Sequence, residues 1–145
     1  MNVQTILSAK GTEVATIAPS ATLADATEML RARGFGALVV SADGKGLDGI
    51  VSERDIVRAL AADGVATLER KVATCMSSEV FTCAPNDSID ALMGMMTERR
   101  IRHLPVVDQN GLAGMISIGD VVKYRLGELE RENDQLHDYI QGNVG

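Results

Sequence analysis

One short phrase occurs twice in this sequence, and its repetition constrains the fold more than any other feature. Residues 49–58 read GIVSERDIVR and residues 114–123 read GMISIGDVVK, so a glycine, a serine and an aspartate recur at matching positions. The match extends upstream, where TIAP (16–19) corresponds to TCAP (82–85). Between these matches the second copy is one residue shorter, within a predicted turn. An internal repeat of this kind predicts two equivalent structural units.

Each copy has the same predicted order of elements, β-α-β-β-α. A short apolar strand (14–17 and 80–83) stops near a proline, which cannot donate to a β-ladder. An amphipathic helix follows, and we expect Thr22 and Asp87 to cap its start in the two copies. Two strands joined by turns rich in Asp, Gly and Asn come next. A second helix then begins at each serine of the phrase, and in the first copy it should end at Gly64.

We therefore predict a mixed α/β (α+β) fold with two β-α-β-β-α repeats packed with pseudo-twofold symmetry, followed by a long C-terminal helix. One copy of about 60 residues buries too little surface to be comfortably stable alone, so the copies should share one globule. The expected segments are a first repeat with its N-terminal segment (1–64), a linker with a lead-in segment (65–76), a second repeat (77–125) and a helical tail (126–145).

The predicted C-terminal helix carries a heptad pattern of mostly apolar residues. Its members alternate steps of four and three: Val122, Leu126, Leu129, Asn133, Leu136 and Ile140. Only about two and a half heptads are present, so such a coiled coil would be marginal by itself, and Gly127 weakens the helix locally. The pattern leaves two interpretations open. One is a homodimer contact, which an asparagine at an a position favours, and the other is a helix that packs on its own globule.

Composition excludes several classes of partner. The 145 residues carry a formal net charge of −6 and only 3% aromatic residues, which argues against nucleic acid or an anionic membrane as a partner. Cys75 and Cys83 form no metal-binding or disulfide pattern, so we expect reduced thiols. The sequence shows no secretory signal and no apolar run of the ~20 residues that span a bilayer, so we expect a cytoplasmic protein.

The serine and aspartate of the repeated phrase allow two interpretations. Ser-x-x-Asp at a helix start is the pattern of a capping box, and Thr22 and Asp25 show the same pattern at another helix. Alternatively, the free amides and positive dipole end of a helix favour a phosphate. An aspartate one turn later can accept hydrogen bonds from the two hydroxyls of a ribose. The position of each phrase, where a strand ends and a helix begins, favours a nucleotide site.

Several matched elements in the same order resemble the tandem CBS (cystathionine-β-synthase) domain pair, also called a Bateman module. They are VATIAP and VFTCAP, ALVV and HLPVV, and GIVSERD and GMISIGD. The resemblance covers nearly the whole chain apart from the helical tail. It implies repeats whose sheets pack together and two clefts that bind adenosine-containing ligands such as AMP, ADP, ATP, NAD(H) or S-adenosylmethionine.

By position, the resemblance implies a role for each candidate site residue. Asp55 and Asp120 would hold the ribose hydroxyls. The phosphate partners would be Ser52, Arg54, Ser117, Arg102 and His103. The adenine slot would be formed by Thr16, Ile17, Ala18, Ala37, Leu38, Thr82, Cys83, Ala84, Leu104 and Pro105. Two of these have an ordinary alternative, because Arg54 fits a solvated helix residue and His103 fits a structural histidine.

The two clefts should not be equivalent. Glu53 and Arg54 in the first copy stand where Ile118 and Gly119 stand in the second, so we expect different ligands or affinities. The sequence contains no catalytic or metal-binding motif. We predict a non-enzymatic sensor that binds an adenine nucleotide, AMP above all, and signals to an unidentified protein as a homodimer. The alternatives are a protein-interaction adaptor with vestigial clefts and, less favoured, a small enzyme that uses NAD(H).

Overall fold

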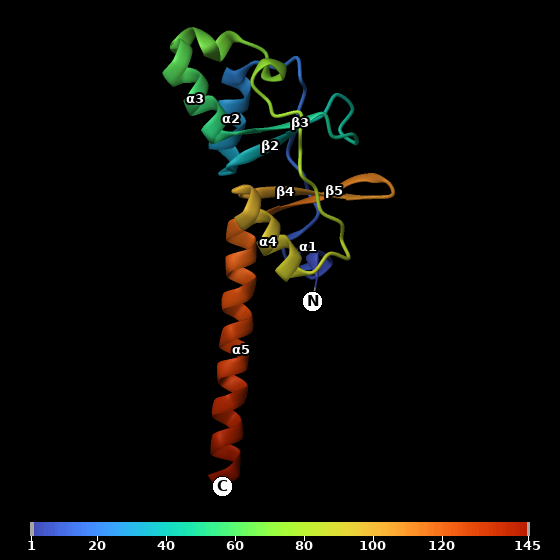
Figure 1. The fold of residues 1–145 in the computed structure, drawn as a ribbon, viewed down its shortest axis with the longest axis vertical. Coiled ribbons are helices and arrows are strands. Elements are labelled where there is room, and N and C mark those ends of the chain that lie inside the picture. The colour runs from blue at the N-terminus through green and yellow to red at the C-terminus, as the bar shows by residue number, and fades with distance from the viewer. Residues whose placement is uncertain (1, 145) are drawn as a thin grey trace.

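The molecule consists of two small α/β halves, stacked on one another, and a long helix that projects from one of them (Figure 1). The computed structural model describes the backbone of residues 2–144 and the side chains of residues 2–140. No helix among these described residues is both long and apolar enough to span a membrane. The two halves follow one another along the chain, as the repeated sequence predicts.

The first half has the predicted order of elements: β1 (Thr16–Ile17), α2 (Leu23–Arg33), β2 (Ala37–Val40), β3 (Gly49–Ser52) and α3 (Glu53–Asp63). The strands form one sheet in the order β1-β2-β3, in which β1 runs parallel and β3 antiparallel to β2. Thr22 caps α2 and Ser52 caps α3, both through complete capping boxes. The C-cap of α3 is Gly64, so these three boundary predictions are confirmed.

The second half contains α4 (Ile89–Arg99), β4 (His103–Asp108), β5 (Gly111–Ser117) and α5 (Ile118–Val144). The predicted strand at 80–83 is wrong, because only a single parallel bridge joins Cys83 to Val106. The reason is Pro105. In the first half the amide of Val39, its counterpart, donates to the carbonyl of Ala15 at 3.2 Å and extends the ladder. Proline has no such amide, so the ladder stops after one bridge.

The cap of α4 also differs from the prediction. Ser88, not Asp87, is the N-cap, because its hydroxyl accepts a hydrogen bond from the Ala91 amide at 3.0 Å. The Asp87 carboxylate instead accepts a hydrogen bond from the Ala84 amide at 2.9 Å. The carboxylate therefore stabilises the turn before the helix and leaves the capping position to the next residue.

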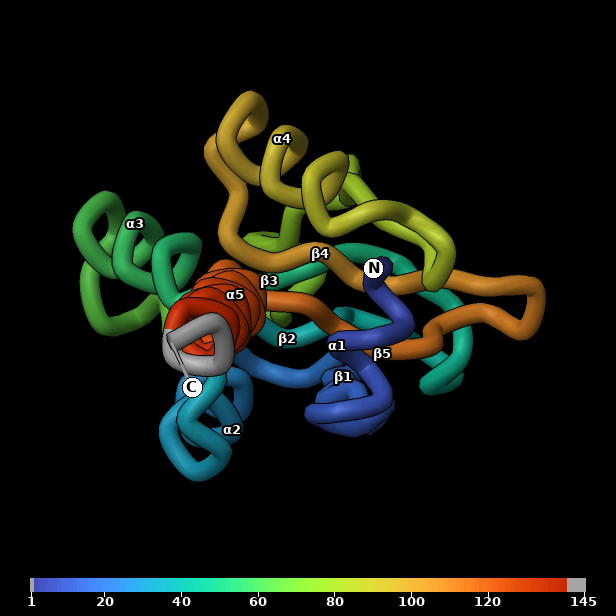
Figure 2. The backbone as a smooth tube through the Cα atoms, turned by 90° about the horizontal axis from the view of Figure 1, so that it is seen from below, coloured from blue at the N-terminus to red at the C-terminus, as the bar shows by residue number. Residues whose placement is uncertain are grey.

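Each half completes its core with a segment from elsewhere in the chain. Residues 3–10 form the helix α1 (Val3–Lys10), which lies alongside β5 (Figure 2) and places Val3, Ile6 and Leu7 in the core of the second half. The linker forms two 3₁₀ turns, η1 (Val65–Glu69) and η2 (Val72–Thr74), and places Val72 in the core of the first half. The two lead-in segments are thus exchanged between the halves.

The C-terminal helix α5 is continuous, as predicted, and only its first turns pack on the globule. Val121 is buried, and Arg125 pairs with Asp90 of α4 and with Glu128. Beyond these turns the helix extends away from both halves (Figure 1). Leu129 and Leu136 of the heptad pattern are 59% and 58% exposed, so the helix does not fold back on its own globule.

Candidate ligand-binding cleft

A cleft with a volume of about 600 Å³ lies where the first half meets the second. The first half contributes the start of β2 and the N-terminal turns of α3, and the second half contributes the segment between α4 and β4. Its lining residues are Gly36, Ala37, Ile50, Ser52, Glu53, Arg54, Asp55, Val57, Arg58, Ser77, Arg100, Ile101, Arg102 and His103. A volume in this range suits a nucleotide-sized ligand.

Ser52 and Asp55 face this cleft as a complete capping box. The Ser52 amide donates to Oδ2 of Asp55 at 2.9 Å, and the Asp55 amide donates to the Ser52 hydroxyl at 3.2 Å. The Ser52 hydroxyl in turn donates to the same Oδ2 at 3.0 Å. The capping interpretation is therefore correct, but it uses only one carboxylate oxygen. Oδ1 of Asp55 has no hydrogen-bond partner among the described residues and remains available to accept from a ligand.

Ser117 and Asp120 form the equivalent pair in the second half, with one addition. The Ser117 amide donates to Oδ2 of Asp120 at 2.9 Å, and the Asp120 amide donates to the Ser117 hydroxyl at 3.2 Å. Lys10 at the end of α1 also donates to Oδ2 of Asp120 at 2.7 Å and to the Met115 carbonyl at 2.8 Å. Burial raises the pKa of the Asp120 carboxyl, but the hydrogen bonds from Lys10 and Ser117 outweigh this, and the pKa lies below its usual value.

Positive charge dominates the cleft although the whole chain is acidic. Four arginines line it, against the two carboxylates of Glu53 and Asp55. These arginines are Arg54, Arg58, Arg100 and Arg102. None of them forms an ion pair with a residue that the structure describes, whereas Arg33 and Arg70 elsewhere on the surface both do. A cleft with unpaired guanidinium groups from two halves favours an anionic ligand.

His103 of the second half lies close to Gly36 of the first half. A methyl group placed on Gly36 would lie 3.1 Å from two ring atoms of His103, so a larger residue there would make the ring shift by a few tenths of an ångström. Burial lowers the pKa of the His103 imidazole, and the charges of Asp120 and Glu53 only partly oppose this. The ring is therefore predominantly neutral at pH 7, and a bound phosphate would favour its protonated form.

The structure brings six of the predicted site residues together in this cleft. They are Ala37, Ser52, Arg54, Asp55, Arg102 and His103. The other predicted residues do not line it: Thr16, Ile17, Ala18, Leu38, Thr82, Cys83, Ala84, Leu104, Pro105, Ser117 and Asp120. Leu38 and Leu104 are fully buried, so neither residue forms a wall of the cleft in this structure. Burial, with the charge of Asp87, raises the pKa of the Cys83 thiol to about 12, so the thiol is uncharged.

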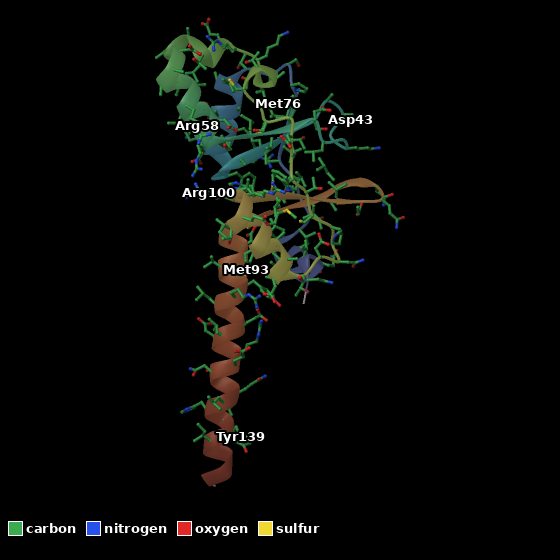
Figure 3. All side chains as sticks on the ribbon, in the orientation of Figure 1. Asp43, Arg58, Met76, Met93, Arg100 and Tyr139 are labelled. Atoms are coloured by element: carbon green, nitrogen blue, oxygen red, sulfur yellow. The ribbon has the colours of Figure 1, made fainter. Side chains whose placement is uncertain are left out.

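Two lining arginines were not among the predicted site residues. Arg58 lies one helical turn after Asp55, a spacing that places both side chains on the same face of α3. This spacing was readable in the sequence. Arg100 follows α4 and belongs to a basic cluster at residues 99–103, which read RRIRH. Nothing in the sequence distinguishes Arg100 from its neighbours in that cluster. Figure 3 shows Arg58 on the first half and Arg100 on the second, at the level where the halves meet.

These features define a pair of α/β repeats that meet at a basic cleft, and comparison with known proteins identifies the family. The model of the CBS domain matches residues 10–62 and 71–127. The chain therefore belongs to the CBS domain family and contains two such domains, as the repeat predicts. Pairs of CBS domains are regulatory modules.

Several known proteins are similar to this chain over most of its length. The CBS domain-containing protein CBSX3, mitochondrial, of Arabidopsis thaliana is 38% identical over 125 residues, which are 83% of this chain and 61% of that protein. The solved structure of the CBS-domain containing protein ATU1752 from Agrobacterium tumefaciens is 44% identical, with a TM-score of 0.82 over 86% of this chain and 92% of that one. The chain thus spans less than two thirds of the plant protein.

A more distant relative shows the same fold with ligands bound. The CBS domain pair of protein MJ0100 was solved in complex with 5′-methylthioadenosine and S-adenosyl-L-methionine. It is 22% identical to this chain, with a TM-score of 0.78 over 88% of this chain and 98% of that one. At this identity the likeness establishes the shared fold.

Proposed function

We propose that this protein is a regulatory module that binds an adenine nucleotide (AMP, ADP, ATP or NAD(H)) in the cleft between its halves and signals to a partner protein. The observation that carries the proposal is the juxtaposition of a carboxylate oxygen of Asp55, free to accept from ribose hydroxyls, with arginines from both halves. The adenosine ligands of the MJ0100 domain pair support the ligand class. Because both halves line the cleft, a ligand there can change their relative packing.

The proposed mechanism needs no catalytic step. A ligand that contacts α3 of the first half and the segment 100–103 of the second stabilises the arrangement in which both are near. Its differential affinity for that arrangement sets the size of the signal. The projecting helix α5 continues directly from the second half, so a shift between the halves would redirect this helix and any surface bound to it.

Substitution of Asp55 tests the nucleotide site. We expect Asp55→Asn to weaken binding of the best nucleotide at least tenfold, because the ribose loses a charged acceptor. Isothermal titration calorimetry with AMP, ADP, ATP and NADH measures this directly. For the wild type, a ligand at 100 times its Kd should also raise the free energy of unfolding by about 2.7 kcal/mol.

Asp25 provides a matched control, because it forms a capping box with Thr22 at the start of α2. Asp25→Asn removes the same charge from the same kind of cap but lies outside the cleft. It should leave nucleotide affinity unchanged. Equal losses of affinity in both variants would show that Asp55 acts only through helix stability. Absence of binding by any of the four nucleotides would exclude the proposal and favour the adaptor function.

We also propose that the protein acts as a homodimer that is held together by α5. The support is a row of exposed apolar side chains at heptad spacing, with Leu126, Leu129, Leu136 and Ile140 each more than half exposed. A second copy of the same helix would cover this row and pair Asn133 with its counterpart.

A further inference from the structure

The arginines of the cleft exceed what a single phosphate requires. The chain has more acidic than basic residues, with a net charge of −6, yet four arginines converge on one cleft. A single arginine can hold a phosphate through two parallel hydrogen bonds. Arg54 and Arg102, expected to meet phosphate from the sequence, already supply two. Arg58 and Arg100 are therefore left over, one on each side of the boundary between the halves.

Arg100 has an unusual backbone conformation. It is the only non-glycine residue with a positive φ among those that the structure describes, with φ 55° and ψ 42° at the C-cap of α4. The corresponding C-cap of α2 is Gly34, with φ 67°. Glycine adopts this left-handed conformation without strain, whereas a side chain with a Cβ does not. The second half thus tolerates strain at a position where the first half uses glycine, and the strained residue directs a guanidinium group to the cleft.

The helix start is a poor phosphate site in this cleft. The single hydroxyl proton of Ser52 is donated to Asp55, and Glu53 places a carboxylate on the first turn of α3. Both features disfavour an anion at the N-terminus of α3. Arg58 lies one turn along α3 from Asp55, and Arg100 comes from the second half. Neither guanidinium group forms an ion pair with a residue that the structure describes.

We propose that Arg58 and Arg100 form a second anion subsite, which makes this cleft selective for adenine nucleotides with more than one phosphate over AMP. The proposal rests on the proposed function for the position of the nucleoside, which Asp55 holds. The first phosphate meets Arg54 and Arg102, and the following phosphate reaches between Arg58 and Arg100. Because these two arginines belong to different halves, the additional phosphate links the halves electrostatically, whereas AMP leaves this link unmade.

The test measures the ratio of the AMP and ATP dissociation constants by calorimetry at fixed ionic strength. We expect the wild type to bind ATP about tenfold or more tightly than AMP. Arg58→Gln and Arg100→Gly should each reduce this ratio to within about threefold of unity, with AMP affinity nearly unchanged. Arg131→Gln removes an equal charge from the projecting part of α5 and should leave the ratio as in the wild type.

Arg100→Gly also separates loss of binding from loss of folding. Glycine relieves the left-handed strain, so the melting temperature without ligand should rise, by about 2–4 °C for a chain of this size. Arg100→Lys keeps the charge and should retain part of the ATP preference. An unchanged ratio in both Arg58→Gln and Arg100→Gly, or a wild type that prefers AMP, would overturn the proposal.

Inorganic tripolyphosphate distinguishes failure of this proposal from failure of the proposed function. It carries the charges of the subsite ligand without a nucleoside. Tripolyphosphate binding that is weakened by Arg100→Gly but unaffected by Asp55→Asn would support the anion subsite even where no nucleotide binds. Nucleotide binding that depends on Asp55, with an ATP to AMP ratio insensitive to both arginines, would retain the function and refute the subsite.

Discussion

The glycine of the repeated phrase is explained by the exchanged lead-in segments. A methyl group on Gly49 would lie 2.7 Å from Sδ of Met76 and 2.7 Å from the carbonyl oxygen of Ser77. On Gly114 it would lie 2.5 Å from Cδ2 of Leu7 in α1. In each half a strand must lack a side chain at this position because a segment from elsewhere in the chain crosses it. The glycine is therefore a packing requirement, and the serine and aspartate serve the helix start and the cleft.

Substitution of these glycines should have unequal effects. Gly49→Ala meets a backbone carbonyl that also accepts a hydrogen bond from Ile50 at 3.0 Å, so the crossing segment must move. We expect it to lower the free energy of unfolding by about 1–3 kcal/mol, as overpacking commonly does. Gly114→Ala meets only the side chain of Leu7 and should cost less. Urea unfolding of both variants measures the difference, and a Gly49→Ala protein as stable as the wild type would contradict this account.

His103 should make stability depend on pH below about 7. Its pKa is lowered in the folded protein by burial and by the positive charges of Lys10 and Arg102, against the opposing charges of Asp120 and Glu53. The unfolded chain therefore takes up a proton at higher pH than the folded protein does. Stability falls as the pH decreases below about 6.5, the usual value for histidine, and this fall ends below the folded pKa.

His103→Gln removes this component, so its stability should change less than that of the wild type between pH 7.5 and 5.5. Chemical denaturation at a series of pH values gives the comparison. The pKa of the Asp120 carboxyl is also lowered in the folded protein, but for an acid this means that the folded state stabilises the charged form. This stabilisation is lost only as the pH falls below 3.8, the usual pKa of the group. Parallel pH profiles for the wild type and His103→Gln would show that the imidazole does not titrate differently on folding.

At the scale of single elements, the sequence was sufficient wherever local chemistry decides the outcome. The repeated order of elements, the caps at Thr22 and Ser52 and the continuity of α5 all follow from local patterns. The prediction of a strand at 80–83 was wrong because the partner strand limits how far the β-ladder extends. The limiting residue, Pro105, lies more than 20 residues away along the chain. Likewise, Arg100 could not be assigned to the cleft, because its direction depends on how the two halves pack.

The exposed row of α5 leads to a prediction about assembly. We expect the wild type to be a dimer and Leu129→Glu to weaken the dimer by two orders of magnitude or more, because about 1.5–3 kcal/mol is lost for each of the two unburied leucines. Leu129 is 59% exposed in the single chain, so the substitution should leave the folded globule intact. Size-exclusion chromatography with light scattering over a concentration series measures the association.

Gln135→Glu adds the same charge at an exposed position outside the heptad row and should not affect the dimer. A wild type that is monomeric at all concentrations would contradict the dimer and leave α5 available for a different protein. Dimers that persist in Leu129→Glu would place the contact on another surface of the globule.

At the scale of the whole molecule, the two halves are alike in fold and different in charge. In the register that pairs Thr16 with Thr82, Lys10 corresponds to Met76, which carries no charge. Lys10 neutralises Asp120, whereas Asp55 has no cationic partner among the described residues. This asymmetry supports the expectation that the two clefts differ in affinity.

The exchange of lead-in segments also orders events during synthesis on the ribosome. Lys10 contacts the carbonyl of Met115, which lies 105 residues later in the chain. The helix α1 leaves the ribosome before either half, yet Ile6 and Leu7 find their partners only when the second half has been made. The first half, by contrast, is complete once the segment up to Ser77 emerges. Nascent chains should therefore acquire protease resistance in two steps, with α1 protected only in the second.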